Sequence, residues 1–211
     1  MTEANVFIIE SLRLDDEKKH RFEGKFLSQI LRLGNKKSMY YYIRTKKELG
    51  KILRLFGKSD YRYLHLSCHG DETSISTTLD RISFSELNEL VRPHVRDKRL
   101  FISACSAVNE HLAKTIIRSS KCFSIIGPAE DILFSDAAII WASFYHLVFK
   151  EDPKKMKRES ILPTLKNVAN TFGISLNYFS ISEKSKTGYK QEKVRPHSEN
   201  DTLGTNRKTE D

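Results

Sequence analysis

Residues 61–70 read YRYLHLSCHG and residues 99–106 read RLFISACS, and these two stretches indicate the fold. Each begins with a run of aromatic, leucine or isoleucine residues, which is typical of a strand buried in a sheet. The first run leads directly toward His69 and the second toward Cys105. Two buried strands are therefore expected to end in residues that can carry chemistry.

Strands and helices alternate on either side of these two stretches. Alternation with short connections predicts an α/β fold of three layers, in which a doubly wound, mostly parallel sheet has helices on both faces. The apolar runs place strands at 5–9, 39–44, 61–67, 99–104 and 122–127, an edge strand at 176–182, and a small hairpin from 74–78 and 82–84. Helical spacing places helices at 22–33, 49–56, 85–90, 108–119 and 159–171, with a long buried helix from residue 135.

Polar residues are expected at the starts of three of these helices. Asp15, Asp16 and Glu17 supply an acidic first turn before the helix at 22–33. Ser85 is the expected cap of the helix at 85–90, and Asp136 is the expected cap of the long apolar helix.

The folded domain is predicted to cover residues 1–182. From Glu183 onward, only Tyr189, Val194 and Leu203 are appreciably apolar. Such a segment cannot bury enough surface to offset the entropy lost on ordering. Residues 183–211 are therefore predicted to be a flexible, charged tail.

The composition is typical of a folded domain, and the charge of the chain does not indicate a particular charged ligand. The chain has 211 residues, of which 39% are hydrophobic and 30% are charged, and its net charge is +9. This length favours one domain that can form a core without disulfide or metal crosslinks. Because the basic residues are scattered, we interpret them as a solvated surface. Nucleic-acid binding is supported by charge alone and is not expected.

Cysteine usage and hydropathy favour the cytoplasm. The three cysteines, an odd number, come without a secretory leader, which indicates free thiols in a reducing compartment. The longest apolar stretch, 137–149, is too short to cross a bilayer and is interrupted by Ser143 and His146. No membrane association is expected.

The candidate site consists of His69 and Cys105. In open α/β sheets the reactive crevice lies beyond the carboxyl ends of the strands, and consecutive parallel strands are usually neighbours. A cysteine needs a base to form a thiolate, and histidine is the usual one. Gly70 lets the backbone approach a substrate carbonyl, so its N–H and that of Cys105 could form an oxyanion hole.

These motifs resemble those of the CHAT family, a branch of the caspase-like cysteine peptidases of the caspase and separase clan. The resemblance covers about residues 1–150, with an extension to 182 left open, and rests on His65–Gly70, Ser103–Ala107, Asp136-Ala-Ala and Phe144-Tyr145. It implies a caspase-like fold and an endopeptidase that needs no cofactor and no metal.

Roles for individual residues follow from the resemblance. Cys105 would attack the scissile carbonyl of a protein or peptide substrate, and His69 would act as acid and base. The family needs no carboxylate to orient the histidine, so Asp71 and Glu72 are interpreted as loop acids. CHAT domains often lie beside repeat or sensor modules, which implies a separate regulatory or sensor protein as a partner.

Substrate specificity is the least defined part of the site. Ser103, two residues before the nucleophile, is expected to line the S1 pocket but is small and neutral. Glu130 and Asp131, in the loop after the next strand, could contact a basic P1 side chain.

Three other interpretations compete with a peptidase. The first is a catalytically silent caspase-like module for binding or signalling, and the second is a nucleic-acid-binding protein. The third is a metal site made from His65, Cys68, His69 and Cys105, which lacks the usual paired spacing of zinc ligands. In an extended strand Cys68 points opposite to His69, so it is expected to be a core residue, while His65 is expected to support the site or to be a buried structural residue.

Overall fold

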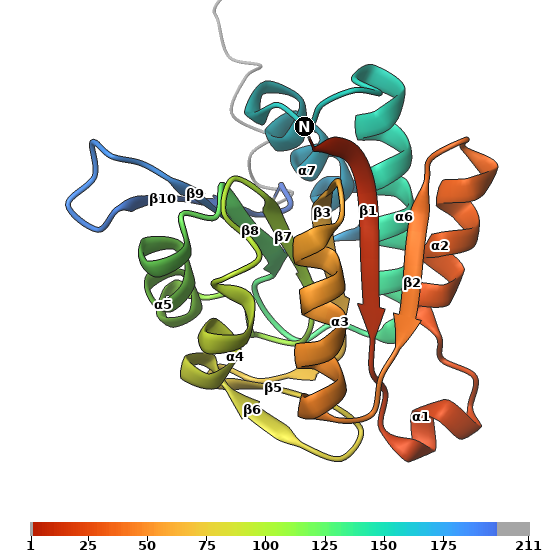
Figure 1. Cartoon of the computed structure of the whole chain (residues 1–211). Coiled ribbons are helices and arrows are strands. Elements are labelled where there is room, and N and C mark those ends of the chain that lie inside the picture. The colour runs from red at the N-terminus through yellow and green to blue at the C-terminus, as the bar shows by residue number, and fades with distance from the viewer. Residues whose placement is uncertain (1, 198–211) are drawn as a thin grey trace, which may run out of the picture.

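A seven-stranded sheet forms the centre of the fold, as the computed structural model shows for residues 2–197 of the chain (Figure 1). The strand order in this sheet is β10-β9-β8-β7-β3-β1-β2, and β4, β5 and β6 form a second, small sheet. The strands are β1 (Glu3–Glu10), β2 (Ser38–Tyr42), β3 (Tyr61–Ser67), β4 (His69–Gly70), β5 (Ser74–Ser76), β6 (Arg81–Ser83), β7 (Arg99–Ser103), β8 (Ser124–Pro128), β9 (Leu176–Ile181) and β10 (Tyr189–Val194). The helices are α1 (Leu14–Lys18), α2 (Glu23–Leu33), α3 (Lys46–Lys58), α4 (Phe84–Val91), α5 (Glu110–Ser120), α6 (Phe134–Glu151) and α7 (Arg158–Phe172).

The sheet is mostly parallel and has helices on both faces. Strands β2, β1, β3, β7 and β8 are parallel, and β9 and β10 are antiparallel additions at one end. Helices α3, α4 and α5 lie on one face, and α2, α6 and α7 lie on the other (Figure 1). The predicted three-layer α/β fold is therefore confirmed.

Alternation along each strand produces two separate cores. In β1, Phe7 and Ile9 pack with the core under α3, α4 and α5, whereas Val6 and Ile8 pack with the core under α2, α6 and α7. Successive side chains of a strand point to opposite faces of the sheet, so each central strand contributes to both cores.

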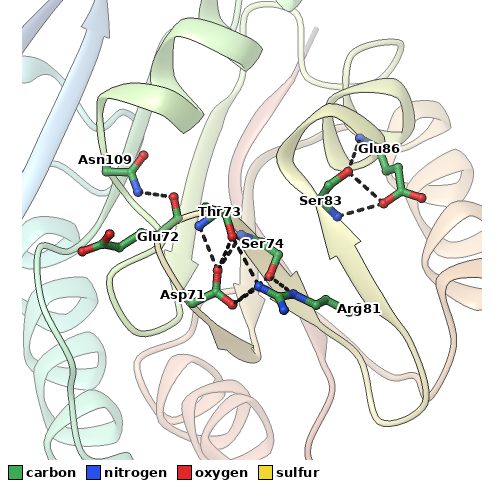
Figure 2. Close-up of polar contacts among 8 residues, drawn as sticks. All are labelled: Asp71, Glu72, Thr73, Ser74, Arg81, Ser83, Glu86 and Asn109. Atoms are coloured by element: carbon green, nitrogen blue, oxygen red, sulfur yellow. Dashed lines mark hydrogen bonds and ion pairs between the residues drawn. The ribbon is translucent and has the colours of Figure 1, made fainter.

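Three predicted helix starts differ from the structure. Residues Asp15–Glu17 belong to the separate helix α1, and α2 begins after Phe22 without a side-chain cap. The cap of α4 is Ser83, two residues before the predicted Ser85, because the side chain of Ser83 accepts from the backbone N–H of Glu86 in a capping box (Figure 2). Asp136 lies in the first turn of α6 rather than at its cap, which is Leu133.

The sheet extends beyond residue 182, the predicted end of the domain. Strand β10 pairs antiparallel with β9 from Tyr189↔Ile181 to Val194↔Leu176, so the folded part reaches the segment that was expected to be flexible. Its central residues are largely charged, which is common in an edge strand, and only its two ends are buried. Residues 198–211 of the expected tail lie outside the described residues.

Within residues 2–197, no helix combines the length and the apolar character needed to cross a bilayer.

Glu10 joins the end of β1 to the start of α2. Its fully buried carboxyl group accepts from the backbone N–H groups of Gly24 (2.7 Å) and Lys25 (3.3 Å) and from the hydroxyl of Tyr40 (2.8 Å). Gly24 permits this approach, since a Cβ there would lie 3.0 Å from the Ile8 side chain. Burial raises the pKa of Glu10 from 4.5 to about 7 despite these hydrogen bonds.

We expect Glu10→Gln to remove a pH-dependent loss of stability. Between pH 4.5 and 7 the folded protein binds more protons at Glu10 than the unfolded chain does, so the free energy of unfolding falls as the pH rises through this window. A 2.5-unit difference corresponds to about 3 kcal/mol at most. Urea unfolding at pH 4.5 and pH 7.5 measures the effect, with the exposed Glu89→Gln as control. Equal pH dependence in the wild type and Glu10→Gln would contradict it.

Candidate active site

The pairing of β3 with β7 places His69 and Cys105 at the same rim of the sheet. The two strands are parallel neighbours, as predicted, and Ser67 lies opposite Ser103 at their carboxyl ends. His69 follows Ser67 by two residues, and Cys105 follows Ser103 by two residues. The two candidate catalytic residues therefore leave the sheet from adjacent, aligned strand ends.

Gly70 brings the histidine segment into contact with the cysteine turn. The backbone N–H of Cys68 donates to the carbonyl of Ser103 at 3.0 Å, which continues the pairing beyond the two strands. A Cβ at Gly70 would lie 3.0 Å from the Cβ of Ala104 and 3.3 Å from the carbonyl oxygen of Cys105. Only glycine allows this approach without a shift of the turn.

The backbone N–H of Gly70 faces away from β5. In the antiparallel pair of β4 and β5, Gly70 lies opposite Ile75, and the neighbouring Asp71 N–H donates to the carbonyl of Ser74. Hydrogen-bonded and non-hydrogen-bonded pairs alternate in such a ladder, so Gly70 occupies a non-hydrogen-bonded position. Its N–H is thus directed to the side of the strand opposite β5.

Cys105 lies at a tight turn that the loop after β8 supports. Ser106, directly after it, adopts a left-handed backbone conformation with φ 52°, which is uncommon for a residue other than glycine. The Ser106 N–H donates to the carbonyl of Glu130, and its hydroxyl donates to the carboxylate of Asp131 at 2.9 Å. The Cys105 thiol lies 3.7 Å from the carbonyl of Ile132. Glu130 and Asp131 are both exposed and hold the turn.

His69 is held by a carboxylate that sequence patterns do not single out. Its Nε2 lies 2.8 Å from Oδ2 of Asp16, whose other oxygen accepts from Arg21 at 3.0 Å. The imidazole also packs edge-on against Phe134, with ring centroids 5.3 Å apart. Burial acts to raise the pKa of Asp16, but the hydrogen bonds from His69 and Arg21 outweigh it and lower the pKa. Asp16 is therefore an ionised partner that orients the ring.

The acidic residues directly after His69 serve the local loop instead. Figure 2 shows the Asp71 carboxylate accepting from the backbone and hydroxyl groups of Thr73 and Ser74 and from Arg81. Burial opposes these contacts, but together they lower the pKa of Asp71 to about 2. Over residues 2–197, the side chains of Asp71 and Glu72 form no hydrogen bond and no ion pair with His69.

Asn109 ties the histidine loop to the cysteine turn. Its amide group donates to the carbonyl of Glu72 at 3.0 Å, as Figure 2 shows, and to the carbonyl of Ser106 at 3.1 Å. Its side-chain oxygen accepts from Leu112 N–H as the cap of α5. One side chain thus fixes both loops and the helix that follows.

The other two cysteines differ from Cys105 in their surroundings. All three are free. Cys122 is buried, whereas Cys68 is partly buried, as Cys105 is, and packs against the core under α3, α4 and α5. Burial raises the pKa of both Cys68 and Cys122 to about 12, so these thiols stay protonated and unreactive near neutral pH. The expectation that Cys68 is a core residue agrees with this position.

His65 lies beneath the site and is fully buried. Its Nδ1 is 3.2 Å from the hydroxyl of Tyr145 and its Nε2 is 3.3 Å from Glu23. Within residues 2–197, no three histidine, cysteine or acidic side chains are arranged as ligands of one metal ion.

A groove of about 660 Å³ lies between the starts of α2 and α6, and its lining includes neither His69 nor Cys105. Ile132, whose carbonyl contacts the Cys105 thiol, and Phe134, which packs on His69, both line it. Neither Glu130 nor Asp131 belongs to its lining, whereas Glu23 does. Ser103 is buried and donates its hydroxyl to Glu23 at 2.9 Å.

Comparisons with known proteins identify the fold rather than a family. No protein-family model matches the chain, and no curated protein matches it by sequence. Among solved structures, a secreted C11 cysteine protease from Bacteroides thetaiotaomicron superposes with a TM-score of 0.59 at 9% identity, over 85% of this chain and 66% of the protease. Caspase-1 from Spodoptera frugiperda superposes with a TM-score of 0.52 at 12% identity, over 90% of this chain and 85% of the caspase. The chain thus spans just under two thirds of the first protease, and its fold is the caspase-like α/β fold.

Proposed function

We propose that the protein is a cysteine endopeptidase in which His69 and Cys105 form the catalytic dyad. The observation that carries this proposal is the β3–β7 register, which aligns the two strand ends from which these residues leave the sheet. The two solved structures named above are cysteine peptidases of the same fold, which supports the same chemistry here. We retain membership of the CHAT family as part of the proposal.

The proposed reaction uses groups that the fold brings to one rim. The Cys105 proton moves to Nδ1 of His69, since Asp16 engages Nε2, and the sulfur attacks the carbonyl carbon of the scissile bond. The N–H groups of Gly70 and Cys105 stabilise the resulting oxyanion. His69 then protonates the leaving amine, and the C–N bond breaks to leave a thioester on Cys105.

Hydrolysis of the thioester completes the cycle. His69 accepts a proton from a water molecule, and the water oxygen attacks the thioester carbonyl. The C–S bond breaks, the product with the new carboxyl group leaves, and His69 returns its proton to the Cys105 sulfur. Apart from water, no step requires a second substrate, an oxidant or a reductant.

The cellular setting is a further part of the proposal. Three free cysteines agree with a reducing compartment, and we propose that the protein acts in the cytoplasm on a protein or peptide substrate. We also propose that a separate regulatory or sensor protein controls it, as for CHAT domains. A catalytically silent binding module is the alternative that the following experiments distinguish.

We expect a peptide-based, cysteine-directed acylating probe to label Cys105 selectively. Labelling should be absent in Cys105→Ala and slower by about 100-fold in His69→Ala, because the thiol then lacks its base. Mass spectrometry of the intact protein and its peptides identifies the modified residue. Cys68 and Cys122 are internal controls, since burial raises the pKa of both thiols to about 12. Equal labelling of all three cysteines, also after addition of cell extract, would favour the silent module.

We expect Asp16→Asn to slow labelling of Cys105 by roughly 10- to 1,000-fold without unfolding the protein. An amide can donate to the imidazole and favour the wrong tautomer, whereas the carboxylate accepts from Nε2 and holds the ring in register. The measurement combines labelling rates with thermal unfolding.

Asp15→Asn is the matched control for this substitution, because Asp15 lies in the same short helix but is exposed. Partial recovery of the labelling rate in Asp16→Glu would separate positioning from packing. Unchanged labelling in Asp16→Asn would show that His69 needs no carboxylate, as the family resemblance implies.

A further inference from the structure

We infer that Glu23 is the specificity residue of the groove beside the dyad, and that it selects substrates with arginine or lysine at P1. This inference rests on the proposed peptidase function, because it names the substrate class of the same site. It starts from the position of one carboxylate on the first residue of α2.

Glu23 and the groove lie on the same face of the sheet. Ser67 in β3 and Ser103 in β7 point toward α2, because both donate their hydroxyls to Oε2 of Glu23 at 2.9 Å. Glu23 itself lines the groove that Ile132 and Phe134 connect to Cys105 and His69. The carboxylate is thus placed below the candidate catalytic residues and on their side of the sheet.

Glu23 is 4% exposed, and its contacts are with a histidine and two serines. Nε2 of His65 lies 3.3 Å from Oε1, and the Ser67 and Ser103 hydroxyls donate to Oε2. In residues 2–197, no lysine or arginine forms an ion pair with Glu23. A guanidinium or ammonium group of a ligand would give this buried carboxylate a charge-assisted hydrogen bond.

The groove provides for the rest of a long basic side chain. Its walls are mainly apolar and include Phe22, Phe26, Leu133 and Phe134, which can contact the methylene groups of lysine or arginine. Arg21 also lines the groove, but its guanidinium is paired with Asp16 and about half exposed. The Asp16 carboxylate therefore matches the charge of Arg21.

The distance along the strand agrees with an S1 subsite. Ser103, which contacts Glu23, precedes Cys105 by two residues, so the two Cα atoms lie at most about 7 Å apart. An extended lysine or arginine side chain bridges a comparable length between the scissile carbonyl and the carboxylate. Ser103 is buried and does not line the groove, so the Glu23 carboxylate that it contacts is the group presented there.

The experiment measures binding to the catalytically inert Cys105→Ala protein by calorimetry. The ligands are peptides that are identical except for a C-terminal arginine, citrulline or norleucine at the position that would occupy S1. Citrulline has the shape of arginine without its charge. We expect the arginine peptide to bind about 30- to 100-fold more tightly than the citrulline peptide, since a charge-assisted contact is lost. Glu23→Gln in the same background should reduce this ratio below about 5-fold.

Glu89→Gln is the matched control, because it removes an exposed carboxylate in α4, on the opposite face of the sheet, and should leave the ratio unchanged. If Glu23→Gln fails to fold, the comparison of arginine with citrulline in Cys105→Ala still decides the question. Equal binding of the two peptides, or tighter binding of norleucine, would overturn the inference. A preference for arginine combined with no labelling of the wild-type Cys105 would uphold the groove and reject the peptidase.

Discussion

The parallel pairing of β3 with β7 is the constraint on which the candidate site depends. It aligns Ser67 with Ser103, so the segments that carry His69 and Cys105 start from the same level of the sheet. A shift of one residue would turn every side chain of β3 to the opposite face and move Tyr63 and His65 into the wrong core. Register is therefore fixed by burial on both faces, and the site's geometry follows from the packing of the sheet.

Two acidic residues of one segment support the rim from the side of α2. Asp16, in α1, holds the His69 ring, and Glu23, at the start of α2, accepts from the last serine of each catalytic strand. Glu10, at the end of β1, accepts from the backbone N–H groups of Gly24 and Lys25 at the same start of α2. The segment from α1 to the start of α2 thus contributes both a group that contacts His69 and a carboxylate that lines the groove, although it contains neither candidate catalytic residue.

The opposite side of the rim is held by the loops that follow β7 and β8. The left-handed conformation of Ser106 is sustained by contacts with Glu130 and Asp131, and Asn109 links the same turn to the histidine loop. Strain of this kind persists only where surrounding contacts hold it. By sequence, Glu130 and Asp131 could contact a basic P1 residue. In the structure they contact Ser106 and do not line the groove, whereas Glu23 does.

The sequence by itself determined most of the strands, the layers and the strand-end positions of His69 and Cys105. Burial periodicity and the strand-end positions of His69 and Cys105 are local properties, so the α/β class and the adjacency of β3 and β7 could be predicted. Only the tertiary structure decided which carboxylates serve the site, because Asp16 is 53 positions from His69 and Glu23 is 80 positions from Ser103. Such contacts depend on how a helix docks on the sheet, and docking is set by packing that leaves no periodic trace in the chain. Strand β10 also depends on a tertiary contact. Its central residues are largely charged and do not form a pattern typical of a strand, and they adopt one by pairing with β9.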